Sequence, residues 1–402
     1  MSTSGLSAGG LARMHDVMAG HVARDSLPGI VVGVHRHGES WVESIGTTAF
    51  GSDRATGPET IFRISSMTKP IVAVAAMTLV EDCLVRLDES VDGWLPELAN
   101  RQVLRDPAGS VDDTIPAQRP ITVRDVLTGT MGFGQLYGPP EQFPILAEAI
   151  QRGVRLFPPM PLTEHDPDEW LRRLGSLPLM HQPGQQWMYN TPSQVLGVLV
   201  ARIVSEPLGS VLQDRVFGPL GMTDTGFNVP PDDLARLAMP YALDQTTGNM
   251  ITIDGAGNDS LWARPPVFPD GAGGLVSTVG DMLAFGQMML GDGRRDETRL
   301  LARPTVAAMT TDQLTRDQKA DALVMGDPDT RGWGFGMSVI TRRDLASSSP
   351  GRFGWDGGFG TSWYADPAEN LTAVLMTQRS FGYPDPGIRD DFWTSLYAAI
   401  DD

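Results

Sequence analysis

Residues 60–80 read TIFRISSMTKPIVAVAAMTLV. The second half of this stretch, Ile71 to Val80, is apolar on every side and too long for a typical strand. It therefore predicts a helix that is covered on all faces. Ser66 and Lys69 stand three residues apart just ahead of this helix, so their side chains are expected one turn apart on the same face.

This spacing suits nucleophilic catalysis. A serine hydroxyl is a poor nucleophile until a base takes its proton, and a lysine serves as that base when burial and neighbours depress its pKa. The start of a helix adds N–H groups and positive potential where an oxyanion would form. The alternative is a serine cap beside an exposed lysine. It is disfavoured because Lys69 precedes Pro70 and a helix without an exposed face.

Strand patterns lie at both ends of the chain, with helical patterns between them. The predicted strands are Gly29–Arg36, Ser40–Ile45, Gly334–Thr341, Arg352–Ala365 and Leu371–Gln378, the first two joined by a turn at residues 37–39. Predicted helices in the middle are Val123–Leu127, Pro144–Gln151, Asp168–Leu174 and Gln194–Val204, and apolar residues at helical spacing predict one more at each end. Seven prolines between Gly138 and Pro167 predict a long ordered loop without a regular element.

These elements predict a mixed α/β (α+β) fold whose sheet is built from both termini. We expect a single domain over residues 1–402. Its sheet subdomain would comprise residues 1–95 plus 270–402, and a mainly helical insertion would span residues 96–269.

Composition limits the partners. The formal net charge of −18 repels phosphate backbones, which argues against nucleic acid as a partner. No apolar stretch is long enough to span a membrane, and no basic start leads into an apolar run, so a cytoplasmic protein is expected. Cys83 is the single cysteine; it excludes an intrachain disulfide and is expected to be a packed thiol.

Two further segments carry candidate chemistry. In Pro183–Thr191 (PGQQWMYNT), Tyr189 precedes a helical stretch. A phenol near a lysine can be held as phenolate or act as a proton relay. The alternative is that Tyr189 is a packed aromatic residue. In Phe353–Trp363 (FGWDGGFGTSW), glycines within a strand pattern indicate close approach of a ligand or another backbone, or simply a bulge or turn.

These three segments, in this order, resemble the serine β-lactamase and penicillin-binding-protein superfamily, whose S-x-x-K pattern Ser66 and Lys69 match. Residues 60–65, 219–222 and 271–278 resemble further family blocks, and the resemblance covers roughly residues 10 to 400. It implies a β-lactamase-like fold with an antiparallel sheet flanked by helices. It also implies Ser66 as nucleophile, Lys69 as its partner, Tyr189 as base, and the backbone N–H groups of Ser66 and Gly358 as oxyanion hole.

Within the superfamily the chain is most similar to class C-like family VIII carboxylesterases. Tyr189-Asn190-Thr191 departs from the Tyr-x-Asn motif, and Trp355-Asp356-Gly357 departs from Lys-Thr-Gly. The family lysine grips a β-lactam carboxylate by charge. Trp355 cannot do so, and Asp356 would repel that carboxylate if it faces the cleft. The departures favour neutral esters over β-lactams and peptides.

The substrate site is expected to combine this third motif with aromatic residues of the Pro-rich segment, which would form an apolar cleft wall. The candidates are Trp355, Asp356, Gly357, Phe359, Phe133, Tyr137, Phe143 and Phe157, with Met160 beside them. The alternative for the Pro-rich segment is that its aromatic residues only pack the helical insertion. No cofactor is expected. A metal pair at His35 and His37 is disfavoured because no third ligand lies near in sequence.

The sequence leaves three functions open. The first is a carboxylesterase that forms an acyl-enzyme on Ser66. The second is a β-lactamase, an amidase or peptidase, or an acyltransferase on the same scaffold. The third is a catalytically inactive sensor, which the presence of Ser66, Lys69 and Tyr189 argues against.

Overall fold

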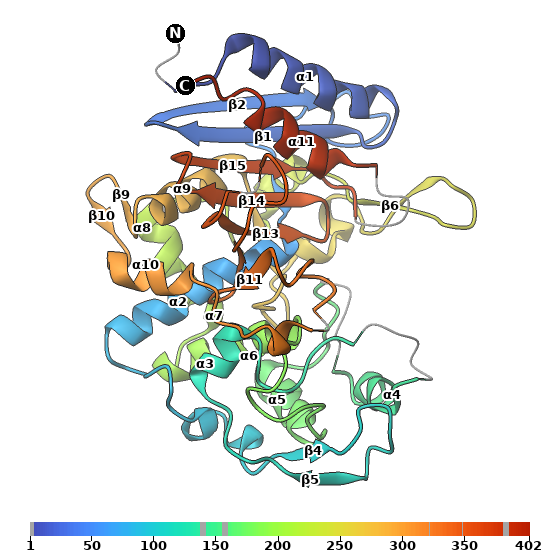
Figure 1. Cartoon of the computed structure of the whole chain (residues 1–402). Helices are drawn as coiled ribbons and strands as arrows, with labels where there is room; N and C mark the ends of the chain where they lie inside the picture. The colour runs from blue at the N-terminus through green and yellow to red at the C-terminus, as the bar shows by residue number, and fades with distance from the viewer. Residues whose placement is uncertain (1–3, 137–141, 155–159, 321, 348, 381–385) are drawn as a thin grey trace.

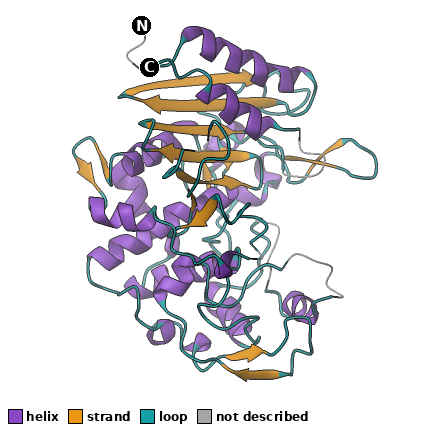
Figure 2. Ribbon diagram, in the orientation of Figure 1, coloured by secondary structure: helices purple, strands orange, loops and turns teal. Residues whose placement is uncertain are grey.

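A seven-stranded antiparallel sheet dominates one half of the molecule, and helices fill the other half (Figures 1 and 2). The computed structural model describes residues 4–136, 142–154, 160–320, 322–347, 349–380 and 386–402. The strand order in the sheet is β11-β12-β13-β14-β15-β1-β2. The antiparallel sheet flanked by helices confirms the fold class expected from the sequence.

The sheet strands come from the two ends of the chain. They are β1 (Gly29–Arg36), β2 (Glu39–Gly46), β11 (Arg331–Trp333), β12 (Ser338–Ile340), β13 (Phe353–Gly357), β14 (Thr361–Asp366) and β15 (Leu371–Met376). β1 lies between β15 and β2, so that Val31 pairs with Met376 on one side and with Ser44 on the other. The β1–β2 turn has positive φ at His37 and Gly38 (50° and 82°), as a two-residue hairpin loop requires.

Shorter strands form two-stranded ribbons. They are β3 (Phe62–Arg63) with β8 (Val276–Ser277), β4 (Gln102–Leu104) with β5 (Thr114–Pro116), β6 (Tyr241–Leu243) with β7 (Met250–Thr252), and β9 (Arg294–Arg295) with β10 (Thr298–Arg299). The β3–β8 pair matters most for function, because it leads directly into Ser66.

Helices cover both faces of the sheet. α1 (Ala8–Ala23) and α11 (Ile388–Tyr397) pack on the face formed by Ile30, Val32 and Val34 (Figure 1). α9 (Val279–Leu290) packs on the opposite face, to which Val31 contributes. A Cβ at Gly33 would come within 2.6 Å of Val279, so glycine is what lets α9 lie close to β1.

The remaining helices lie beside the lower strands of the sheet in Figure 1 or below them. They are α2 (Thr68–Glu81), α3 (Val123–Thr128), α4 (Pro144–Gln151), α5 (Pro167–Gly175), α6 (Thr191–Val204), α7 (Leu208–Leu212), α8 (Gly218–Leu220) and α10 (Arg303–Met309). α2 is buried from Thr68 to Leu79, as its all-apolar sequence predicts. The main hydrophobic core extends from Trp170 of α5 through α2 to Trp363 of β14, so it joins the helical region to the sheet.

Four local predictions were wrong. Residues 352–365 do not form one strand, because the chain turns at residues 358–360 and β13 and β14 pair as a hairpin. Residues 334–341 do not form one strand, because the chain reverses between β11 and β12, where Gly336 has a φ of 78°. The Pro-rich segment is not without a regular element, because it contains α4, the helix predicted at Pro144–Gln151. Pro144 stands at the first helical position, where a missing N–H costs nothing. Cys83 is exposed rather than packed. α2 ends at Glu81, and Cys83 takes a left-handed conformation that turns the chain towards solvent.

Among the described residues, no single helix is long and apolar enough to cross a membrane; α6 passes such a test only together with residues 208–220, across a bend of 83°.

Candidate active site

Ser66 sits in a tight turn that two other segments hold in place. The turn is a 3₁₀ segment, Ser65–Met67, that leads straight into α2. The N–H of Ile64 donates to the carbonyl of Leu275 (3.0 Å), and the carbonyl of Ile64 accepts from the Thr361 hydroxyl (3.1 Å). Ser65 has a φ of 49°, a strained conformation for a residue with a side chain. The fold therefore imposes the shape of the turn that presents Ser66.

Lys69 lies against Ser66 and is fully enclosed. Its Nζ contacts Ser66 Oγ (3.0 Å), Asn190 Oδ1 (3.1 Å) and the carbonyl oxygen of Ala272 (2.6 Å), and only 1% of the residue is exposed. The amide and carbonyl oxygens can only accept hydrogen bonds. In its neutral form, Lys69 donates its two hydrogens to them and turns its lone pair towards the Ser66 hydroxyl. Three partners thus match the three free positions of a tetrahedral nitrogen.

Burial favours the neutral form of Lys69. Removal of water lowers the pKa of its ammonium group to about 7, although the nearby carboxylate of Asp270 acts in the opposite direction. At neutral pH a large fraction of Lys69 is therefore a free amine, as a general base for Ser66 requires.

Tyr189 approaches Ser66 from the other side. Its hydroxyl donates to Ser66 Oγ (2.9 Å) and accepts from Trp355 Nε1 (2.7 Å). An indole N–H is only a donor, so it fixes the direction of the phenol hydrogen towards Ser66. The rings of Trp187, Trp333 and Trp355 surround Tyr189, and this burial raises the pKa of the phenol to about 12. Tyr189 is therefore a neutral donor at physiological pH.

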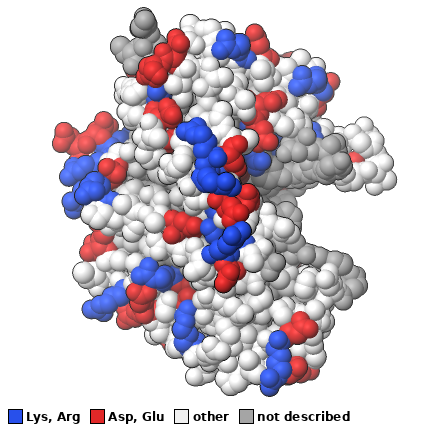
Figure 3. Space-filling view, in the orientation of Figure 1, with Lys and Arg blue, Asp and Glu red and all other residues white. Residues whose placement is uncertain are grey.

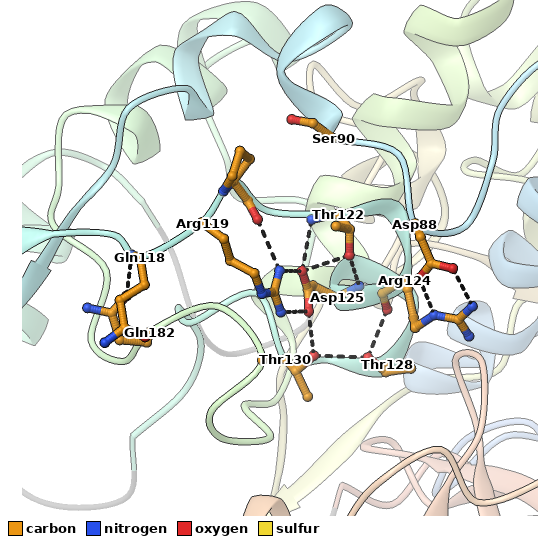
Figure 4. A network of polar contacts seen from close by, with 12 residues as sticks. Asp88, Ser90, Gln118, Arg119, Thr122, Arg124, Asp125, Thr128, Thr130 and Gln182 are labelled. Atoms are coloured by element: carbon orange, nitrogen blue, oxygen red, sulfur yellow. Dashed lines mark hydrogen bonds and ion pairs between the residues drawn. The ribbon is translucent and has the colours of Figure 1, made fainter.

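The segment that carries Tyr189 is pinned to residues that follow α3. The N–H of Gln135 donates to the carbonyl of Tyr189 (2.9 Å), and the N–H of Met188 donates to Gly129 (2.8 Å). At the start of α3, Asp125 accepts from Thr122, Thr130 and both terminal nitrogens of Arg119 (Figure 4). This network holds α3 and residues 129–135, and we call this segment, which bonds to the backbone of Met188 and Tyr189, the platform of Tyr189.

The glycines of the third motif lie beside the nucleophile turn. A Cβ at Gly357 would meet the carbonyl oxygen of Ile64 at 2.3 Å, so only glycine lets β13 approach so closely. Gly358 follows β13 and is partly exposed. The proposed donor role of its N–H and that of Ser66 stays a prediction. Phe359 is buried against Trp262 in a separate small cluster, which is a packing role.

Asp356 faces away from Ser66. Adjacent strand residues point to opposite faces, so Trp355 meets Tyr189 while Asp356 meets α11. Its carboxylate pairs with Arg389 (3.1 Å) and accepts from Ser362 (2.6 Å) and Tyr364 (3.3 Å). Asp356 lines a cavity of about 260 Å³ on that side. The anticipated repulsion of a substrate carboxylate by this side chain therefore does not arise in the described arrangement.

The structure places the predicted substrate-binding aromatic residues of this region in different environments. Phe133 is fully buried in the main core, which favours the packing alternative for this residue. Phe143 is partly buried against the same core, and Met160 is partly buried beside the cluster of Phe359. Tyr137 and Phe157 lie outside the described residues.

The sequence reasoning missed two contacts of Lys69 and one nearby carboxylate. Asn190 was read only as a departure from a motif, yet its amide oxygen contacts Lys69. Asp270 and Ala272 flank a turn far away in sequence, and Asp270 is buried between the Ala272 N–H and Gln194. The glycines at 271, 273 and 274 were the available signal, because they indicate a tight turn close to another backbone.

Among the described residues, no group of three or more histidine, cysteine, aspartate or glutamate side chains is placed to hold a metal ion. His35 contacts Ser40 and Gln287, and His37 contacts Asp402. On the face shown in Figure 3, basic and acidic side chains are intermixed.

Comparison with known proteins identifies the family. The Beta-lactamase family model matches residues 14–397. The chain belongs to the β-lactamase family. Esterase EstB of Burkholderia gladioli is 31% identical, with 94% of this chain and 92% of EstB covered. An uncharacterized protein of Mycobacterium tuberculosis is 41% identical, with 80% and 78% covered.

The β-lactamase-family scaffold is also shared with an enzyme of known structure. EstCE1, described as a hydrolase with promiscuous acyltransferase activity, superimposes with a TM-score of 0.80 at 25% identity, over 96% of this chain and 98% of that one. The chain is thus an enzyme of the β-lactamase-like hydrolase kind.

Proposed function

We propose that this protein is a serine esterase that hydrolyses uncharged carboxylic esters through an acyl-enzyme on Ser66. The observation that carries the proposal is the hydroxyl of Ser66 held between the Nζ of Lys69 and the phenol of Tyr189. The name of the relative EstB supports ester hydrolysis on this scaffold.

The contacts support a division of labour between Lys69 and Tyr189. Lys69, with its pKa near 7, takes the Ser66 proton as Oγ bonds to the ester carbonyl carbon. The carbon–oxygen bond to the alcohol then breaks, and the departing alkoxide takes the proton of Tyr189. The proton on Lys69 passes to the Tyr189 oxygen, which restores both groups. In the second step the proton of Tyr189 first passes back to Lys69. Tyr189 then takes a proton from water as the water attacks the acyl carbon, and Lys69 returns its proton to Ser66 Oγ as the acid leaves.

Uncharged substrates fit the charges around the site. At the family's lysine position, Trp355 is 5% exposed and is committed to Tyr189. Arg389, on α11 beyond the strand, is already paired with Asp356 and Asp390. A substrate carboxylate at β13 would therefore meet an indole instead of a cation, and it would pay for the loss of water without a charged partner.

Acyl transfer is the second candidate, because EstCE1 combines hydrolysis with promiscuous acyltransferase activity. Transfer differs from hydrolysis only in the second step, where an alcohol replaces water at the acyl-enzyme. Adding a primary alcohol to an ester assay separates the two: a transferase forms the new ester in proportion to the alcohol, whereas a strict hydrolase forms only acid.

The direct experiment compares short-chain nitrophenyl esters with a chromogenic cephalosporin. We expect ester turnover with a far slower reaction of the cephalosporin, and loss of ester turnover on the order of 10³-fold or more in Ser66→Ala. Ser65→Ala is the matched control, because Ser65 neighbours the nucleophile but its hydroxyl has no recorded hydrogen bond. Cephalosporin turnover that equals ester turnover would contradict the esterase assignment. An active Ser66→Ala variant would contradict the nucleophile.

A further inference from the structure

Lys69 is held by a turn whose own anchor is a buried carboxylate. The carbonyl of Ala272 accepts from Lys69 Nζ at 2.6 Å, the shortest of the three contacts of that nitrogen. The orientation of this carbonyl depends on Asp270, which accepts from the Ala272 N–H (2.7 Å) through its side chain and from the N–H of Gly274 (2.9 Å) through its backbone. Asp270 therefore shapes the turn that faces Lys69.

The same carboxylate ties the turn to α6. Its second oxygen accepts from Gln194 Nε2 (3.0 Å), one helical turn after Asn190, which also contacts Lys69. A Cβ at Gly271 would come within 3.1 Å of Gly197, so the turn lies directly on the helix backbone. Burial raises the pKa of Asp270. The N–H groups of Ala272 and Gln194, which donate to its two oxygens, and the nearby Lys69 act in the opposite direction and favour the ionised form.

We propose that Asp270 is a positioning residue, which holds Lys69 against Ser66 through the carbonyl of Ala272 and faces it with a buried negative charge. The proposal rests on the proposed function, in which Lys69 is the base. It assigns to Asp270 no contact with substrate.

The charge of Asp270 acts on the protonation of Lys69. Two titratable side chains besides Ser66 face Lys69 among the described residues: Asp270 from the turn, and Tyr189, whose ring centroid lies 4.4 Å from Nζ. Tyr189 is neutral, so Asp270 is the group that opposes the effect of burial on the Lys69 pKa. Without that charge, the pKa of Lys69 falls further.

The composition of the chain makes this directly measurable. Lys69 and Lys319 are the two lysines of the sequence. Protein labelled with ¹³Cε-lysine therefore gives two side-chain signals, and Lys319→Arg assigns them. Lys319 pairs with Asp312 (2.8 Å), which also accepts from the N–H of Trp333, and its signal serves as an internal reference.

The test is the pH titration of the Lys69 signal in the full-length protein and in Asp270→Asn. Asparagine keeps the shape, and its NH₂ group can donate to Gln194 Oε1, which has no recorded partner. We expect the Lys69 inflexion to fall by about one pH unit, the scale for loss of a nearby buried charge, while that of Lys319 stays unchanged. Asp281→Asn, which neutralises a buried carboxylate at the start of α9, should leave both inflexions in place.

An unchanged Lys69 inflexion in Asp270→Asn would overturn the proposal. If that variant does not fold, Gln194→Leu replaces it: loss of the donor weakens the ionised form of Asp270, so the Lys69 inflexion should also fall, though by less. The acid limb of kcat/KM should move in parallel with the signal. Because the titration needs no substrate, a wild-type protein without ester turnover would refute the proposed function while the titration still decides the role of Asp270.

Discussion

Lys69 is one of only two lysines in the sequence. The chain has two lysines against 29 arginines, so nearly every structural and surface cation is arginine. Arginine stays protonated inside proteins, whereas a buried lysine loses its proton readily. Lys69 stands where burial lowers its pKa to about 7, and Asn190 and Ala272 accept the two hydrogens of the free amine. A base at this position requires lysine.

The first prediction concerns pH. In the proposed mechanism free Lys69 is the active form. Its pKa is about 7, so kcat/KM for a neutral ester should rise as pH increases through 7 and then level off. After the plateau, no fall in kcat/KM is expected before the pH approaches 12, where Tyr189 ionises. Initial rates between pH 5 and 10 measure the profile, and Lys319→Arg should leave it unchanged. Rates that decline above pH 7 would instead require a protonated Lys69.

The second prediction concerns Trp355. Trp355→Phe keeps a ring among the aromatic neighbours of Tyr189 but removes the N–H that points the phenol hydrogen at Ser66. We expect kcat to fall by about tenfold, the scale of one neutral hydrogen bond, with little change in KM. Trp333→Phe is the control, because Trp333 also packs against Tyr189 at 6.5 Å and has no recorded hydrogen bond to its hydroxyl. Equal losses in both variants would mean that ring packing alone matters.

At the scale of elements, Asp125 stabilises the platform of Tyr189. It closes a capping box at the start of α3 and binds Arg119 and Thr130 at once (Figure 4). Asp125→Ala should lower the free energy of unfolding by about 2 kcal/mol, since it removes a helix cap and leaves buried donors without a partner. Urea unfolding measures the loss. Asp88→Ala, which breaks the exposed pair with Arg124, should cost much less.

The sequence predicted elements best where their signal is local. The apolar run of α2, the short apolar run of β1 and the helical spacing of α1 and α11 each specify burial by themselves, and the structure agrees. The single strand predicted over residues 334–341 failed because Gly336 reverses the chain within a run that is mostly apolar on both sides of it. The prediction that Cys83 is packed failed because α2 ends before it and the left-handed conformation of Cys83 exposes the side chain. The apolar residues that precede it gave no sign of this helix end.

The candidate site was predictable only in part, for the same reason. Ser66 and Lys69 are neighbours in sequence, so a spacing rule finds them. Tyr189 required a family resemblance, because its contact with Ser66 bridges 123 residues. Asp270 and Ala272 reach Lys69 across about 200 residues, and no sequence pattern encodes that distance. The face of the sheet to which the Asp356 side chain points could not be predicted either. Strand alternation shows that Trp355 and Asp356 point to opposite faces, but not which of these faces lies next to Ser66.

On the scale of the whole molecule, the site lies where segments from distant parts of the chain meet. Ser66 comes from the start of α2, Tyr189 from the helical region, and Trp355 from a strand of the sheet. Strand β1 lies between β15 and β2, so neither end of the chain is dispensable for the sheet. An alignment of reactive groups within 3 Å therefore depends on the packing of the whole core.

This dependence leads to the last prediction, that the helical region and the sheet unfold together. Trp170 of α5 and Trp363 of β14 belong to one continuous core, and Trp393 of α11 packs on the outer face of the same sheet. Loss of either half would expose apolar surface of the other, so a single cooperative transition is expected. Labelling with 5-fluorotryptophan gives one ¹⁹F signal for each of the nine tryptophans, and substitution to phenylalanine assigns these three. All three native signals should disappear at the same urea concentration, together with ester turnover. Loss of the Trp170 signal while those of Trp363 and Trp393 persist would show that the helical region is an independent folding unit.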